Sequence, residues 1–223
     1  MSSPEVRDGI GDGDPGNDAR SVVLERIRSA LADGPPALPI PRDYDTALAP
    51  SIDIPALFVE RCGDYRATVQ RTTDVELPAV VAAVLARHNV ERLAVPRGVP
   101  DRWLAATIVD RVADDPPLAH RELDGVDGTI TGCAVAIAET GTVVLDAGPD
   151  QGRRALSLLP DLHVCVVMAS QVAGSVPEAL TRLTPTAPLT WISGPSATSD
   201  IELQRVEGVH GPRRLEGIVV DDR

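Results

Sequence analysis

The sequence predicts an α/β fold, a layered sheet that is mainly parallel and carries one antiparallel hairpin. Short apolar runs alternate along the chain with segments of helical periodicity, a pattern typical of strands joined by crossover helices. The 223-residue chain is 43% hydrophobic but contains only two Trp, two Tyr and one Phe. Its core must therefore consist of Val, Leu, Ile and Ala, which favours closely packed layers of helices on a sheet.

The body of the chain divides into strands and helices by periodicity. The clearest helix covers residues 75–88, where apolar residues from Leu77 to Leu85 recur at the spacing of one helical face. Cys133–Ala138 and Thr142–Leu145 flank Glu139-Thr140-Gly141, which predicts the antiparallel hairpin. The remaining predicted strands are Ala67–Thr72, Arg92–Val95, the apolar run Leu162–Met168, Leu189–Ile192 and Leu215–Val220. The remaining predicted helices are Asp101–Ala106 and Pro177–Leu183.

The N-terminal part has a different composition. Residues 1–18 contain five Asp/Glu, four Gly and two Pro, so they are predicted to form a disordered acidic tail. Leu24, Ile27 and Leu31 fall at helical spacing and predict a helix over Ala19–Ala32, followed by a Pro-rich linker. Residues 19–55 thus form an arm that either docks on its own domain or contacts a partner protein, and residues 56–223 form the α/β domain.

Charge and cysteine usage exclude several classes of function. A net charge of −12 would repel a phosphate backbone, which argues against nucleic-acid binding. No run of about 18 apolar residues and no charged-then-apolar N-terminus occurs, so neither a membrane span nor a secretory signal is predicted. Cys62, Cys133 and Cys165 are isolated in sequence and no C-x-x-C occurs, so we expect buried thiols of a cytosolic protein.

Three clusters of small, hydroxyl and acidic residues stand out in the last third of the chain. They lie within Ile137–Leu145, Ile192–Glu202 and Gly208–Pro212, and the first two follow apolar strand-like runs. A strand delivers the residues after it to a sheet edge, where Gly, Ser and Thr present backbone N–H and hydroxyl donors to a ligand. Three such clusters in one chain predict a composed site.

The sequence motifs of these clusters resemble those of a known family. Ala-Glu-Thr-Gly-Thr at 138–142, Gly-Pro-Ser-x-Thr-x-Asp-Ile-Glu at 194–202 and Gly-Val-His-Gly-Pro at 208–212 are similar to the LUD domain family of bacterial lactate utilization proteins, the family of LutC. The resemblance extends from about Phe58 to Val220. Many relatives have Arg where this chain has Ala197, so a guanidinium contact from that position is not expected.

The resemblance implies a fold and a function. The implied fold is Rossmann-like, of the NagB/RpiA/CoA transferase-like class. The implied function is that of an accessory subunit of the cytoplasmic L-lactate utilization system, which oxidises L-lactate to pyruvate with LutA- and LutB-like iron–sulfur proteins. Since the chain lacks a clustered cysteine framework, no cofactor and no metal is expected in it, and the iron–sulfur clusters are expected on the partners. The alternative is a stand-alone small-molecule enzyme of the same fold class, using Glu139 and an anion-binding loop at 194–200.

Glu139 is the first candidate catalytic residue. It follows an apolar strand, where partial desolvation would suit a general base or a nucleophile. Gly141 permits a tight reversal, and Thr140 and Thr142 place hydroxyls beside the turn. The turn resembles the Glu-Asn-Gly turn that bears the catalytic glutamate of coenzyme A transferases, with Thr in place of Asn. The alternative is a hairpin whose glutamate faces water.

The loop at 194–200 is a candidate anion site. Gly194, Ser196 and Thr198 follow a strand and precede a helix-compatible segment, and backbone N–H groups at such a helix start favour an anion. The family motif adds Asp200 and Glu202. Alternatively, Ser199-x-x-Glu202 only forms a capping box. The segment Gly128–Gly132 resembles a loose glycine loop, but it lacks the P-loop lysine and the three-glycine spacing, so it is a weak nucleotide motif.

Two further residues complete the predicted site. Arg154 matches the Arg-x-x-Ser-x-x-Pro pattern of the family and, with Arg153, offers positive charge for a small anionic ligand. Paired arginines in an acidic protein alternatively form surface ion pairs. His210 lies in a turn-rich Gly-Val-His-Gly-Pro segment suited to a positioned imidazole, and it is either catalytic or hydrogen-bonded to the backbone.

Overall fold

The computed structural model describes residues 15–32, 34, 38–198, 206–207 and 211–221. It separates the chain into two units, Met1–Tyr44 and Asp45–Arg223. The first unit contains the helix α1, Pro15–Ala30, which begins four residues earlier than the predicted helix. Its first turn therefore occupies residues assigned to the acidic tail, and residues 1–14 lie outside the described part of the chain. Pro15 at the first helical position explains the earlier start, since its fixed φ suits that position.

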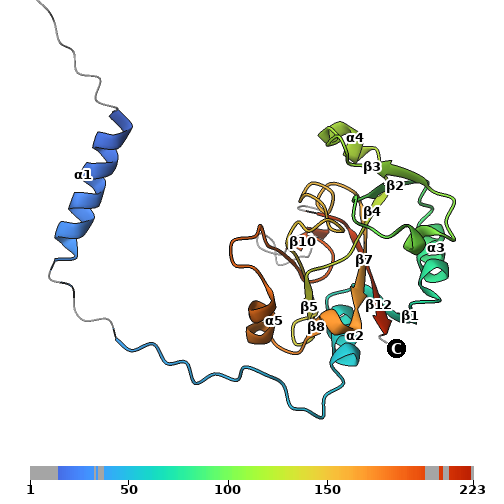
Figure 1. Cartoon of the computed structure of the whole chain (residues 1–223), viewed down its shortest axis with the longest axis horizontal. Helices are drawn as coiled ribbons and strands as arrows, with labels where there is room; N and C mark the ends of the chain where they lie inside the picture. The colour runs from blue at the N-terminus through green and yellow to red at the C-terminus, as the bar shows by residue number, and fades with distance from the viewer. Residues whose placement is uncertain (1–14, 33, 35–37, 199–205, 208–210, 222–223) are drawn as a thin grey trace, which may run out of the picture. The chain divides into compact units, whose positions relative to one another are not determined.

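The second unit is built on a six-stranded parallel sheet (Figure 1). Its spatial order is β1-β12-β7-β4-β2-β3, and every neighbouring pair is parallel. The strands are β1 Thr68–Thr73, β2 Arg92–Val95, β3 Asp110–Ala113, β4 Gly128–Thr131, β7 Leu162–Met168 and β12 Arg214–Asp221. The central strands β4, β7 and β12 are almost entirely buried, as expected for parallel strands covered on both faces.

A second, four-stranded sheet carries the predicted hairpin. Its order is β8-β5-β6-β9, with β5 Val135–Ile137, β6 Thr142–Leu145, β8 Val172–Ala173 and β9 Thr190–Ile192. The antiparallel pairing of β5 with β6 is confirmed. The hairpin is not an extension of the parallel sheet, because β5 pairs with β8 and β6 pairs with β9 in a separate sheet. A short pair, β10 Ala197–Thr198 with β11 Val206–Glu207, follows it.

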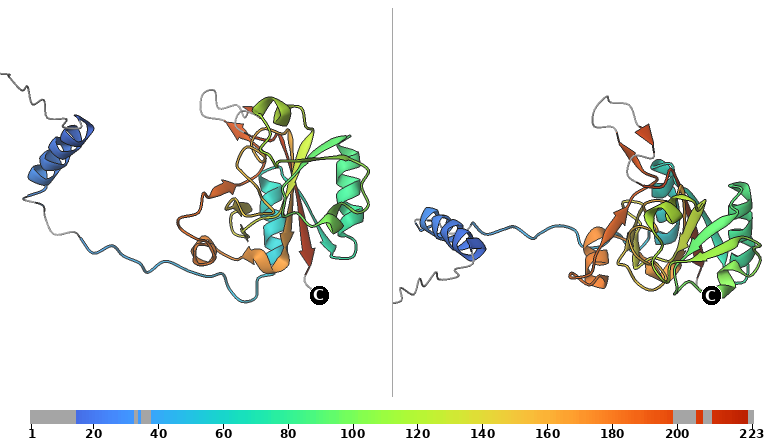
Figure 2. Two further views of the ribbon diagram at one scale, coloured as in Figure 1. Left: turned by 45° about the horizontal axis from the view of Figure 1, so that its top comes forward. Right: turned by 90° about the horizontal axis from the view of Figure 1, so that it is seen from above.

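Helices complete the layers on both sides of the parallel sheet (Figure 2). One face packs against α3, Leu77–Arg87, and the short 3₁₀ helix Asp101–Leu104. The other face packs against α2, Ile54–Asp64, and the inner side of the second sheet. The outer side of the second sheet is covered by α5, Val176–Arg182, and the small helix α4, His120–Asp124, covers the edge near β2.

The predicted α/β class is confirmed, and most differences concern short elements. The helix α2 was not predicted because its start lies in the Pro-rich linker, where Pro55 occupies the first turn and Asp53 caps it. Strand β4 was interpreted as a glycine-containing loop, but its four residues are fully buried between β2 and β7. Burial between two neighbouring strands, which depends on tertiary contacts, makes β4 a strand.

Candidate functional site

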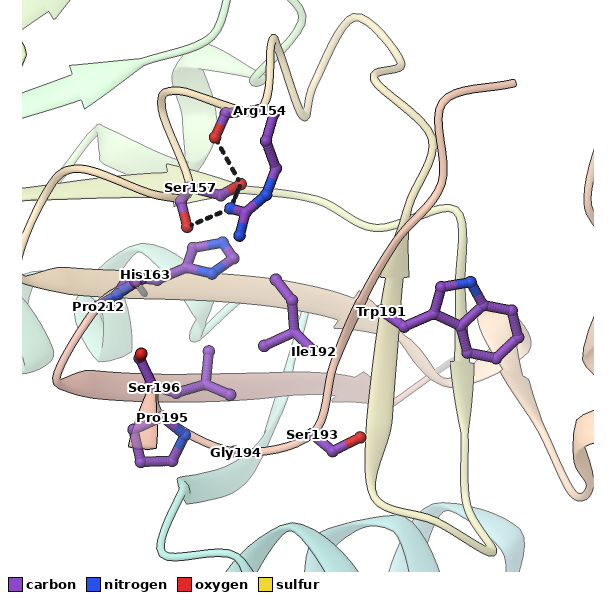
Figure 3. A pocket seen from close by; sticks show the side chains of 12 residues that line it. Arg154, Ser157, His163, Trp191, Ile192, Ser193, Gly194, Pro195, Ser196 and Pro212 are labelled. Carbon is purple, nitrogen blue, oxygen red and sulfur yellow. Dashed lines mark hydrogen bonds between the residues drawn. The ribbon is translucent and has the colours of Figure 1, made fainter. Parts of the chain in front are cut away.

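A cavity of about 230 Å³ lies between the two sheets, at the amino-terminal ends of β7 and β12 (Figure 3). It is closed on one side by the end of β9 and on another by the turn that contains Arg154 and Ser157. None of its described lining residues is Asp or Glu. These residues are Arg154, Ser157, His163, Trp191, Ile192, Ser193, Gly194, Pro195, Ser196, Gly211, Pro212 and Leu215.

Arg154 supplies the positive charge of the cavity. Its Nη1 donates to the backbone oxygen of Ser157 at 2.9 Å and to Ser157 Oγ at 3.1 Å, so the side chain is tied to its own turn. Within the described residues, Nε and Nη2 have no hydrogen-bond partner, and no carboxylate lies within ion-pair distance of the guanidinium. Partial burial lowers the pKa of Arg154, although an arginine stays charged at neutral pH.

The neighbouring arginine behaves differently. Arg153 donates through Nε and Nη2 to both carboxylate oxygens of Asp114, at 2.7 and 2.8 Å, and this contact holds the pKa of Asp114 below its ordinary value. The surface ion pair that was the alternative interpretation is therefore correct for Arg153. Arg154, in contrast, lines the cavity and forms no ion pair with a described carboxylate.

His163 forms the buried floor of the cavity. Its side chain is 1% exposed, and its Nε2 lies 2.7 Å from the hydroxyl oxygen of the fully buried Thr131. Burial, together with the nearby charge of Arg154, lowers the pKa of His163 from 6.5 to about 4. The imidazole is therefore neutral at physiological pH, and Figure 3 shows it beside the guanidinium.

The hairpin turn is linked to the cavity wall by hydroxyl groups. Thr140 Oγ1 and Thr142 Oγ1 share a hydrogen bond of 2.7 Å, and Thr142 Oγ1 shares a second one, also 2.7 Å, with Ser193 Oγ. Ser193 lines the cavity. The threonines of the first cluster therefore support a wall residue of the second cluster without lining the cavity themselves.

The remaining described parts of the clusters also meet at this wall. Ser196 lines the cavity, and its backbone N–H donates to the carbonyl oxygen of Pro212 at 2.8 Å, which joins the second cluster to the third. Both predicted glycines are required by close backbone contacts, and Gly194 also lines the cavity. A Cβ on Gly141 would lie 2.6 Å from the backbone of Arg61, and one on Gly194 would lie 2.6 Å from the carbonyl oxygen of Tyr65. Both glycines have positive φ angles, +57° and +81°.

Glu139 is not among the described lining residues of the cavity. Its side chain is exposed, and its backbone N–H donates to the carbonyl oxygen of Gly174. The partial desolvation expected at this position is therefore not observed, because the carboxylate lies beyond the end of β5. Asp200, Glu202 and His210 lie outside the described residues, as does the side chain of Thr198.

The three cysteines are free and buried, as expected. They lie in the core between the parallel sheet and the second sheet, and burial raises the pKa of Cys62 to about 12. Among the described residues, no three His, Cys, Asp or Glu side chains are grouped as metal ligands. No helix in the same residues has the length and apolar character needed to cross a membrane.

The fold and the motifs of this cavity define the class of protein. The LUD domain model matches residues 56–220, and the chain belongs to the LUD domain family. A crystal structure of a DUF162 family protein from Deinococcus radiodurans superposes with a TM-score of 0.65 and 44% identity, covering 75% of this chain and 96% of that one.

Two relatives indicate which members of the family this chain is similar to in sequence, the lactate utilization proteins C. Lactate utilization protein C of Deinococcus radiodurans is 46% identical over 211 residues, which cover 91% of this chain and 96% of the relative. Lactate utilization protein C of Geobacillus kaustophilus is 29% identical over 194 residues, 77% of this chain and 80% of the relative. The predicted resemblance to this family is confirmed.

The residues at the floor of the cavity were not predicted from the sequence. His163 was included in an apolar strand and Thr131 in a loop, while Ser157 and Ser193 appeared only as parts of longer motifs. A usable signal was present, because a histidine within an otherwise apolar, buried strand must find a hydrogen-bond partner. That partner comes from β4, 32 residues earlier in the chain, and only the sheet order brings it close.

Proposed function

We propose that the protein is an accessory subunit of the bacterial L-lactate utilization system, which acts in the cytoplasm with LutA- and LutB-like iron–sulfur proteins that oxidise L-lactate to pyruvate. The observation that carries this proposal is the 46% identity to a lactate utilization protein C over nearly its whole length. The oxidation removes two electrons and two protons from the substrate, so it needs an electron acceptor. In this proposal the iron–sulfur partners take that role.

The chemistry of the cavity supports a small carboxylate as the ligand of this subunit. Arg154 offers a guanidinium whose Nε and Nη2 have no protein partner among the described residues, and a side-on pair of these nitrogens matches the two oxygens of a carboxylate. Ser193 and Ser196 add hydroxyl groups at the wall. A volume of about 230 Å³ suits a molecule of a few heavy atoms.

Co-purification from the native host tests the proposal. The tagged full-length chain is expected to bring down two iron–sulfur proteins, and the assembly is expected to reduce an artificial electron acceptor in a manner that depends on L-lactate. A matched preparation from a strain that lacks the chain should lose this activity. Lactate turnover by the purified chain alone, or an active assembly without the chain, would contradict the accessory role.

Two arginine variants sharpen the same assay. Arg154→Gln removes the charge of the cavity and is expected to weaken lactate-dependent reduction by about tenfold or more, since hydrogen bonds to a charged group are worth about 1.5–3 kcal/mol. Arg97→Gln is the control, because that side chain is 86% exposed and pairs with Asp115 away from the cavity. Equal activity of the two variants would remove Arg154 from the site.

The stand-alone enzyme remains the alternative function, with Glu139 as general base or nucleophile. The hydroxyl chain from Thr140 to Ser193 is the observation in its favour, because it connects the turn that bears Glu139 to the cavity wall. The accessory role is preferred because of the 46% identity to a lactate utilization protein C over 91% of the chain.

A further inference from the structure

One ring nitrogen of His163 is directed into the cavity without a protein partner. Nε2 bonds to Thr131, whereas Nδ1 has no hydrogen bond to any described residue. In the described part of the chain, Trp103 Nε1 is the only fully enclosed polar side-chain atom that lacks a partner. Nδ1 of His163 is therefore not enclosed. The 1% exposed side chain of His163 lines the cavity beside Arg154, and Nδ1 is the ring nitrogen left to face it.

The contact with Thr131 decides which nitrogen carries the proton. A neutral imidazole has one N–H donor and one bare acceptor nitrogen. The hydroxyl of Thr131 is fully buried, and among the described residues Nε2 of His163 is its only hydrogen-bond partner. If Nε2 carried the proton, the Thr131 hydroxyl hydrogen would be buried without an acceptor, which is costly. Thr131 therefore donates to Nε2, and the ring proton resides on Nδ1.

We propose that His163 is a specificity-determining residue, which donates a hydrogen bond from Nδ1 to the 2-oxygen of a small 2-oxo or 2-hydroxy carboxylate whose carboxylate group is held by Arg154. The carboxylate and the 2-oxygen of such a ligand both accept hydrogen bonds, and Arg154 and His163 both donate them. The two donors belong to neighbouring walls of a cavity of about 230 Å³ (Figure 3). Lactate and pyruvate belong to this class. The choice of ligand therefore rests on the proposed function, whereas the arrangement of the two donors is independent of it.

The tautomer is measured directly on the wild-type chain. Nitrogen-15 NMR of the imidazole rings, with His163 assigned by its loss in a variant, is expected to show a proton on Nδ1 and a bare Nε2. The tautomer should persist between about pH 5 and pH 8, since burial keeps this ring neutral there. A proton on Nε2, or an imidazolium in this range, would overturn the inference without any need for a ligand.

Binding to the purified full-length chain tests the ligand class. Titration calorimetry with pyruvate, L-lactate and propionate is expected to show pyruvate and L-lactate binding about three- to tenfold more tightly than propionate, which has the same carbon chain but no 2-oxygen. Arg154→Gln should weaken the binding of all three by about tenfold or more, because each has a carboxylate. Arg97→Gln should leave all three unchanged.

Two isosteric variants separate the two ring nitrogens. In His163→Asn the amide nitrogen takes the place of Nδ1, so the preference over propionate should be kept. In His163→Gln the amide takes the place of Nε2 and keeps the contact with Thr131, so the preference should fall to about one. A reversed order, or an unchanged preference in His163→Gln, would contradict the proposed role. If neither variant folds, the wild-type tautomer and the three wild-type affinities decide.

The outcome is distinguishable from that of the proposed function. If the isolated chain binds none of the three carboxylates while the co-purified assembly oxidises lactate, the inference about His163 is wrong and the accessory role stands. If the isolated chain shows the expected preference but the assembly has no lactate-dependent activity, the inference stands and the accessory role is wrong.

Discussion

Acidification should destabilise this protein through His163. The pKa of this side chain is about 4 in the folded protein, because burial and the charge of Arg154 disfavour the imidazolium, whereas its ordinary value is 6.5. Between these two values the unfolded chain binds a proton that the folded chain does not bind, so the free energy of unfolding falls as the pH falls. The stability contributed by the neutral ring is complete above about pH 6.5 and is lost progressively towards pH 4.

The size of the effect follows from the two pKa values. One pKa unit corresponds to about 1.4 kcal/mol, so the full loss is about 3.5 kcal/mol, of which about 2 kcal/mol is reached by pH 5. Urea unfolding at about pH 7, 6 and 5 measures it, read as the difference between wild type and His163→Gln, which has no titratable group at this position. His120→Gln is the matched control, because His120 is exposed, and it should retain the wild-type pH dependence.

Other groups also titrate in this range, and the comparison of variants removes their common contribution. The acid sensitivity should depend on the burial of the His163 ring and on the nearby charge of Arg154, which together lower its pKa. Equal losses of stability in wild type and His163→Gln between about pH 7 and pH 5 would refute the reasoning, since the ring would then carry no depressed pKa.

Three further predictions concern single substitutions. Glu139→Gln should leave lactate-dependent reduction close to wild type, because the exposed carboxylate lies outside the described cavity wall, whereas a loss of about a hundredfold would support the enzyme alternative. Glu216→Gln should lower the free energy of unfolding by about 1–3 kcal/mol in urea titrations, since this buried carboxylate accepts from Arg87 Nη2 and contacts His88 Nε2, each at 2.7 Å. Gly141→Ala should destabilise by more than about 1 kcal/mol in thermal melts, whereas Gly63→Ala, with open space around it in α2, should be neutral or stabilising by up to about 1 kcal/mol; equal melting temperatures would contradict this reading.

The family and the fold class were predictable from the chain alone. Alternating apolar runs and helical periodicity are local properties, and they identified strands such as Arg92–Val95 and the helix around Leu77–Leu85 within a few residues. The three polar clusters were predictable because each motif consists of consecutive residues. Arg154 belonged to such a motif, and the structure places it in the cavity.

The division of the chain into two sheets was a matter of tertiary structure. Strand β4 pairs with β2 and β7 inside the sheet and is buried, although its residues include Gly and two Thr. In the same way the hairpin β5–β6 forms a layer of its own with β8 and β9. Periodicity describes which residues of a strand share a face, but strand order depends on contacts between residues far apart in the chain.

Local sequence determined that this chain has apolar strands, a tight glycine turn and hydroxyl-rich segments, because each of these follows from the chemistry of a few consecutive residues. Which of two adjacent arginines forms an ion pair with a described carboxylate, and which nitrogen of His163 faces the cavity, depended on the tertiary structure. Asp114 is 39 residues from Arg153, and Thr131 is 32 residues from His163. Their contacts arise only when the parallel strands are ordered in the sheet, and those contacts turn a histidine in an apolar strand into the floor of a site.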